Sequence, residues 1–389
     1  MILSLTAIFS CTLSMTVFTL ILFWIVKKNS RLEKLGILNT YIFAIFILVR
    51  GYLPFDFYKI HLTKTYFSTK IIPTIQDIYA IPVITDGKKS ISIINLILFI
   101  WIAIACYFGI KKIKGYLSYW KTLKNVSSFT CSQVEEIYRK ASYATFPKKE
   151  KNCKIIILHD LPTPVVFGQI HPIILLPNIS YSKEELYYIF LHELLHIKHR
   201  DFILKIFCDI ISIIYWWNPF ISRLFPSLMK QLQELYVDYD ISKSLNNQEK
   251  LPYLNAIRRT VMHSMDLNSQ KPDFLYSFCS VNPNVNIMQR LFFITQPHLK
   301  KLSKKAILLC FVLLLFSLSF VFEGWSILPE DETGTFTIEE DGNNFLIQND
   351  DGTYECYIDG ISIGDIIAFK KDDLIGTFPI YQSIEEAYK

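Results

Sequence analysis

Glycine and proline are scarce in this sequence, at 13 and 16 of 389 residues, and it holds no internal repeat or low-complexity tract. These absences exclude collagen-like, disordered and solenoid architectures. The 8 cysteines include no C-x-x-C pair, so neither a zinc ribbon nor a thioredoxin-type site is supported. The formal net charge of +5 is small for this length and gives no sign of direct nucleic-acid binding.

Hydrophobic residues, by contrast, are abundant. They make up 51% of the chain, and the mean hydropathy is +0.29, which excludes a purely cytosolic globule. Residues 2–26 are uncharged, and a helix of that length, rising about 1.5 Å per residue, crosses a hydrocarbon core of about 30 Å. Three further apolar segments give a prediction of four transmembrane helices, at 2–26, 35–55, 92–110 and 306–323.

The basic residues beside these segments indicate their orientation. Clusters begin at Lys27 after the first segment, at Lys111 after the third and at Lys300 before the fourth. Positive flanks stay in the cytoplasm during insertion, so we expect both chain termini outside the cell. The segment 324–389 has 15 Asp or Glu against 3 Lys and is therefore expected to be extracellular.

The remaining stretches indicate two folded parts of different kinds. Residues 154–158 and 163–177 are predicted as short strands in an otherwise helical block, which makes that block α+β. In the acidic tail, Asp341-Gly342, Asp351-Gly352 and Asp359-Gly360 separate short runs and predict tight β-hairpins. The predicted fold is a mainly α polytopic membrane protein with four parts: a membrane region 1–110 with three transmembrane helices, a cytosolic domain 111–305, a fourth transmembrane helix 306–323, and a small extracellular β module 324–389.

The strongest chemical signal is the run His192-Glu193-Leu194-Leu195-His196. Ser182 followed by Glu185 forms a capping-box pattern and predicts a helix that begins near 183. Two histidines four residues apart on a helix face the same side, so His192 and His196 can bind one zinc ion. Glu193 beside the metal would act as the general base. The apolar flanks favour a metal site over uncoordinated histidines, since burying those would be costly.

A catalytic zinc ion needs a third protein ligand, for which Glu234 is the best candidate. Asp238 lies four residues later on the same helical face and could accept the free N–H of a ligand histidine. From the residues alone, two solvated helix carboxylates are an equally consistent interpretation. The rival ligands are Asp240, Glu184 and His199, and we expect His199 to be exposed.

These motifs together resemble a known family. HELLHIKHRD, then WWNP and QELYVDYD, with FGQIHPIILLP upstream, are similar to the BlaR/MecR-type antirepressor membrane zinc metallopeptidases. The resemblance implies a gluzincin-like peptidase of the bacterial cell membrane in which His192, His196 and Glu234 bind Zn²⁺ and Glu193 is the general base. It also implies supporting roles for Asp201 and Asp238. Gln233 departs from the family pattern, which usually has Arg at that position, and Tyr236-Val237 replace a small pair.

The resemblance further implies a signalling role, in which the cytosolic peptidase domain is activated and a transcriptional repressor is inactivated, often with cleavage of the receptor itself. The expected partners are the lipid bilayer and, as substrate, a winged-helix-type repressor, and the reading is compatible with a homodimer. Family members that sense β-lactams carry a penicillin-binding domain with Ser-x-x-Lys. Residues 324–389 are too few for that domain, and Ser326, Ser362 and Ser383 have no such lysine, so covalent β-lactam sensing is not predicted.

Two alternative functions stay open at this point. One is an HtpX-type quality-control zinc protease, which shares H-E-x-x-H and a later Glu-x-x-x-Asp. The other is a non-catalytic receptor with a structural zinc site, although such a site needs a fourth ligand and has no use for Glu193. Two local hypotheses accompany them. Residues 164–177 either lie at a sheet edge, where substrate is held as an added strand, or form an ordinary core strand, and residues 278–290 form a linker or a self-cleavage loop.

Overall fold

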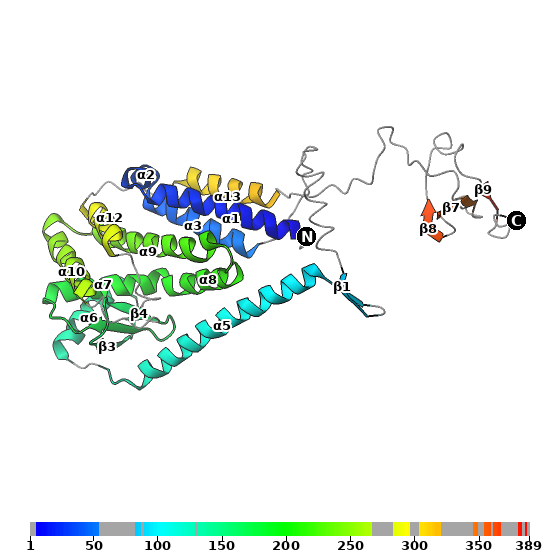
Figure 1. Cartoon of the computed structure of the whole chain (residues 1–389). Helices are drawn as coiled ribbons and strands as arrows, with labels where there is room; N and C mark the ends of the chain where they lie inside the picture. The colour runs from blue at the N-terminus through cyan, green and yellow to red at the C-terminus, as the bar shows by residue number, and fades with distance from the viewer. Residues whose placement is uncertain are drawn as a thin grey trace. The chain divides into compact units, whose positions relative to one another are not determined.

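The computed structural model describes twelve parts of the chain, which divides into two compact units, Met1–Gly324 and Trp325–Lys389. Helices dominate the first unit, whereas the second contains short strands (Figure 1). The described residues are 5–53, 82–86, 89–128, 131–148, 150–266, 283–295, 303–319, 345–348, 354–358, 361–366, 380–382 and 386.

Three apolar helices lie side by side at one face of the first unit (Figure 1). α3 (Ile37–Tyr52) packs against both α1 (Leu5–Val26) and α13 (Lys304–Ser319). The short α2 (Asn29–Leu35) meets α3 at a bend of 89°. Gly36 forms that bend with φ 90°, a conformation that glycine adopts without the penalty of a side chain.

By length and composition, the described residues contain fewer candidate membrane spans than the four predicted. Within the described residues, Ile8–Val26 and Asn95–Asn125 are long and apolar enough to cross a membrane. The bent pair α2 and α3 adds a third span if the two are counted together, and the apolar part of α13, Ile307–Ser317, is shorter. Four spans therefore stay a prediction.

α5 (Ile93–Asn125) is much longer than the segment 92–110 expected to be helical. The helix continues through the lysines after residue 110, so the expected boundary at 110/111 lies within one continuous element. A hairpin of β1 (Pro82–Asp86) and β2 (Lys89–Ser92) precedes it. Large apolar side chains along α5 are exposed, for example Phe99 at 70%, and such a surface is favourable in lipid and costly in water.

Residues 154–177 of the first unit contain a three-stranded sheet. Its order is β3 (Lys154–Leu158), β5 (Ile173–Pro177), β4 (Val165–Phe167), with β3 parallel and β4 antiparallel to β5. The hypothesis that residues 164–177 lie at a sheet edge is therefore right for one of the two strands in this range and wrong for the other. β4 is an edge strand, but β5 is central because its residues pair with a strand on each side.

The site helices pack between this sheet and the apolar helices. α6 (Ser132–Thr145) and α10 (Asn247–Asp266) contact α7 (Lys183–His199). α8 (Asp201–Ile214) and, after the π-helical turn η2 (Phe220–Leu224), α9 (Phe225–Ser242) lie between α7 and α3. α12 (Pro283–Thr295) covers α9 and α10. One apolar core joins α1, α3, α8, α9 and α12, so the site region and the apolar helices are continuous.

The second unit is a four-stranded sheet of order β8-β7-β6-β9. β6 (Phe345–Gln348), β7 (Tyr354–Ile358) and β8 (Ile361–Ile366) pair antiparallel, and β9 (Ile380–Tyr381) is parallel to β6. The strands on either side of Asp351-Gly352 and of Asp359-Gly360 pair antiparallel, as the two predicted hairpins require, while both Asp-Gly pairs themselves lie outside the described residues. The pair at 341–342 lies outside the described residues.

Candidate metal centre

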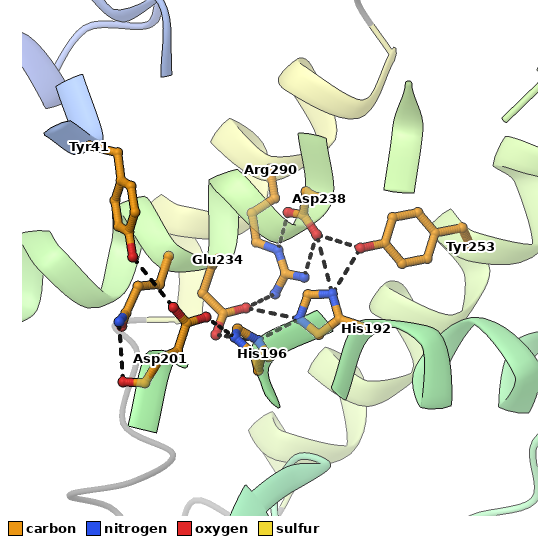
Figure 2. A network of polar contacts seen from close by, with 9 residues as sticks. Tyr41, His192, His196, Asp201, Glu234, Asp238, Tyr253 and Arg290 are labelled. Atoms are coloured by element: carbon orange, nitrogen blue, oxygen red, sulfur yellow. Dashed lines mark hydrogen bonds and ion pairs between the residues drawn. The ribbon is translucent and has the colours of Figure 1, made fainter. Parts of the chain in front are cut away.

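α7 presents the two histidines of the H-E-x-x-H run to one point. The helix begins as predicted, because the Ser182 hydroxyl accepts from the Glu185 N–H and the Glu185 carboxylate accepts from the Ser182 N–H. One turn apart, His192 and His196 approach each other with their Nε2 atoms 3.1 Å apart. Both ring edges therefore face the same small volume (Figure 2).

α9 brings Glu234 to the same volume from a different part of the sequence. Its carboxylate oxygens lie 3.3 Å from His192 Nε2 and 3.8 Å from His196 Nε2. One ligand atom from each of the three residues falls within 4.8 Å of the other two. The structure thus brings the three predicted ligands together, whereas Glu184 is exposed in the first turn of α7.

His196 is supported by a residue close to it in sequence. Its Nδ1 donates to Asp201 Oδ2 at 2.6 Å, and the Tyr41 hydroxyl of α3 donates to the other oxygen at 3.4 Å. Arg200 makes this possible. It joins α7 to α8 in the left-handed conformation, φ 60° and ψ 33°, and so turns the first residue of α8 back toward His196.

His192 is supported by residues far from it in sequence. Its Nδ1 lies 3.0 Å from the hydroxyl of Tyr253 on α10, and that hydroxyl donates to Asp238 on α9. Asp238 itself is 3.6 Å from His192 Nδ1, so the predicted support reaches the histidine through Tyr253. Arg290 on α12 donates to both Asp238 oxygens, at 2.7 and 2.9 Å, and lies 3.0 Å from Glu234 Oε2 (Figure 2).

These contacts determine which histidine nitrogen is free to bind a metal ion. Asp201 is an acceptor, so His196 must carry its proton on Nδ1. Tyr253 gives its hydroxyl proton to Asp238, so it can only accept from His192, which must also be protonated on Nδ1. With Nδ1 of each ring occupied by its proton, Nε2 is the nitrogen that can bind a metal ion beside Glu234, in competition with a second proton.

The electrostatic balance of the site suits a divalent cation. Burial raises the pKa of Glu193, against the lowering effect of His196 and His192. Burial would also raise the pKa of Glu234, but Arg290 and the two histidines hold it well below its usual range. For His196, burial lowers the pKa, yet the bond to Asp201 and the charge of Glu234 outweigh it and raise the pKa to about 9. The surroundings thus favour positive charge at this point.

A cleft of about 1170 Å³ opens over the three candidate ligands. Val165 and Val166 of the edge strand β4 line one wall, and Glu193 lies in the lining beside the histidines. Glu193 is 6% exposed. A buried carboxylate with a raised pKa next to a metal position has the placement of a general base, and the cleft is large enough for an extended peptide.

Sequence reasoning erred at some neighbouring residues. His199, expected to be exposed, is 10% exposed, because its Nε2 pairs with Asp240 at 2.8 Å and its ring stacks on Tyr236. His199 and Asp240, both considered as rival ligands, therefore bond to each other. Residues 283–290, interpreted as part of a linker or self-cleavage loop, are helical, while 278–282 lie outside the described residues.

Two residues of the site were missed entirely. Tyr253 carried no motif signal. Arg290 did carry a sequence signal, because it is the single charged residue in Pro283–Thr295, PNVNIMQRLFFIT. A lone arginine in an apolar helix requires a buried partner. Gln233, which departs from the family pattern, donates to the backbone oxygen of Asp201 at 3.4 Å and so joins α9 to the start of α8.

Comparison with known proteins gives a family match over most of the chain. The family model described as BlaR1 peptidase M56 matches residues 7–294. The methicillin resistance mecR1 protein of Staphylococcus aureus is 26% identical over 214 residues, which are 53% of this chain and 34% of that protein. The regulatory protein BlaR1 of Staphylococcus aureus is 29% identical over 222 residues, 55% of this chain and 36% of that one.

The regulatory protein BlaR1 of Bacillus licheniformis is 33% identical over a shorter segment of 99 residues, 25% of this chain and 16% of that protein. The aligned part of the chain thus spans about a third or less of the length of these curated relatives.

Proposed function

Because the chain belongs to the BlaR1 peptidase M56 family, we propose that it is an integral-membrane zinc endopeptidase, with the metal held by His192, His196 and Glu234. The observation that carries the proposal is the convergence of these three donors beneath a cleft that also contains Glu193. Two imidazoles and one carboxylate are a donor set of catalytic zinc sites, which leave one position open.

The fit of a metal ion to this point is supported by the protonation that the neighbouring residues impose. Asp201 and Tyr253 each hold a ligand histidine through Nδ1, so both Nε2 lone pairs are directed at Glu234. Bound zinc would supply Lewis-acid activation of water and of the peptide carbonyl. Glu193 would take the proton from the attacking water and pass it to the leaving amine.

β4 would position the substrate. Val165, Val166 and Phe167 pair with β5 on one side, which leaves the other edge of the strand at the cleft. A peptide added there as a further strand would receive main-chain hydrogen bonds and lie across Glu193. We propose that the substrate is a cytosolic transcriptional repressor of the winged-helix type, with four membrane spans placing the peptidase region in the cytosol.

The test uses the purified full chain and cells that produce it. Wild-type protein should contain about one zinc ion, and Glu193→Gln should keep that metal and lose proteolysis, since it removes the base and no ligand. Comparing new protein amino termini between wild-type and Glu193→Gln cells identifies the substrate. Glu184→Gln, an exposed carboxylate on the same helix, is the matched control and should behave as wild type.

The same termini in Glu193→Gln cells would refute catalysis by this residue. Signalling that needs the three ligands but survives Glu193→Gln would indicate a receptor with a structural metal site instead.

A further inference from the structure

The guanidinium of Arg290 joins two carboxylates that lie one helical turn apart on α9. It donates to both oxygens of Asp238 and lies 3.0 Å from Glu234 Oε2. Asp238 is fully buried, and the side chain of Arg290 is 17% exposed. Two carboxylates on one face of a helix repel each other, so a cation shared between them is needed to hold both near the histidines.

The shape of the arginine side chain matters as much as its charge. The planar guanidinium presents several N–H groups in a fixed geometry, so one residue reaches Asp238 through two nitrogens and Glu234 through the third. A lysine ammonium is a point charge and cannot make this fork. Arg290 therefore fixes the direction from which the Glu234 carboxylate approaches His192 and His196.

The residue before Arg290 connects the same helix to the apolar helices. The Gln289 amide donates to the Val26 carbonyl, at the last residue of α1, at 2.9 Å, and to the Asn29 side chain at 3.0 Å. Gln231 of α9 donates to the amide oxygen of Gln289. Gln289 is 5% exposed, and a carbonyl at a helix end has no partner within its own helix.

Two consecutive residues of α12 thus bond to opposite neighbours, one at the end of α1 and the other at the candidate metal ligand. We propose that Arg290 is a positioning residue for Glu234 and that Gln289 couples it to the carboxyl end of α1, so that a displacement of this end changes metal affinity. The inference rests on the proposed function, because it assumes that Glu234 is a ligand. It gives a route by which the apolar helices act on the site without touching a ligand.

The test measures zinc affinity of the full chain in detergent, by competition with a chelator of known affinity. Arg290→Gln should bind zinc about 10- to 100-fold more weakly, the range found when a partner of a metal ligand is removed. Arg290→Lys should lie between this variant and wild type, since it restores charge without the fork. Gln289→Leu should also weaken binding, although residue 289 does not contact the site.

Matched controls separate this role from a loss of folding. Arg259→Gln removes another paired arginine, on α10, and Gln248→Leu makes the same change as Gln289→Leu at an exposed position. Both should keep wild-type zinc affinity. Thermal unfolding of each variant is recorded as well, and Arg290→Lys decides the question if Arg290→Gln does not fold.

The outcomes are distinct. Folded Arg290 variants with wild-type zinc affinity would overturn the positioning role, even if their Tm were lower. Wild-type affinity in Gln289→Leu would overturn the coupling to α1. A wild-type chain that binds no zinc would overturn the proposed function itself, and the inference with it.

Discussion

The two histidines of the site are supported in opposite ways. His196 bonds to Asp201, five residues later in the chain, across a single turn at Arg200. His192 depends on residues from α10, α9 and α12, which are separated from it by 40 to 100 residues. The direct partner of His196 on Nδ1 is therefore set by local chain geometry, whereas the partners of His192 are set only by packing of distant helices.

The energetic consequences of this difference follow from burial. On the distant side, Asp238 is fully buried and serves Tyr253 and Arg290 together, so its loss affects several groups. On the local side, Asp201 receives bonds from His196 and Tyr41. Removing a support on the distant side should thus cost more than removing one on the local side. Four experiments test this comparison, from the largest expected effect to the smallest.

Asp238→Ala should lower the free energy of unfolding by about 3–5 kcal/mol, because it removes the main partner of a buried arginine. Asp201→Ala should lower it by about 1–3 kcal/mol, the cost of a lost buried hydrogen bond. Denaturant titration of the detergent-solubilised chain, followed by tryptophan fluorescence, measures both, with exposed Glu184→Ala as control. Equal losses would remove the distinction between the two sides.

Tyr253→Phe should reduce zinc affinity about tenfold, because the Nδ1 proton of His192 then lies 3.6 Å from its nearest acceptor, Asp238. Tyr41→Phe changes the local side by the same single oxygen atom. Its contact with Asp201 is longer, 3.4 Å, so we expect little change in affinity. Chelator competition measures both, and a larger effect from Tyr41→Phe would reverse the comparison.

The pair of His199 and Asp240 joins α7 to α9 away from the metal, and it should respond to pH. Burial raises the pKa of Asp240, but His199 and Lys243 outweigh it and lower the pKa to about 2. A lowered pKa means that stability is present above the unfolded value, near 3.8, and is lost as pH falls toward 2.

Asp240→Asn should therefore be less stable than wild type by about 1–2 kcal/mol at pH 6, with the difference disappearing between pH 4 and 2. Zinc affinity at pH 7 should be unchanged, since Asp240 bonds to no predicted ligand. A stability difference independent of pH would contradict the assigned pair.

Arg200→Gly should raise the free energy of unfolding by up to about 1 kcal/mol, because glycine adopts the left-handed conformation without strain. Lys198→Gly, two residues earlier in the last turn of α7, should lower it by about the same amount. Thermal unfolding compares them. Effects of the same sign would show that the turn at Arg200 does not hold Asp201 in place through backbone conformation.

Several elements of the fold could be predicted from local patterns. The capping box at Ser182 and Glu185 gave the start of α7, and two Asp-Gly pairs gave the hairpins of the second unit. The edge position was right for β4 and wrong for β5, because strand order depends on which segment pairs on both sides. The end of α5 was missed since hydropathy marks apolar length, whereas a helix continues through charged residues.

For the site, the spacing of His192 and His196 places both rings on one face whatever surrounds the helix. The sequence alone determines that spacing, and it also gives the candidates on α9, where Asp238 lies four positions after Glu234. The tertiary structure decided which partners hold these groups. Tyr253, and not Asp238, bonds directly to His192, and Arg290 lies between the carboxylates of Glu234 and Asp238. Asp240 bonds to His199. Local geometry follows from bonded neighbours, but contacts between distant helices depend on how the whole core packs.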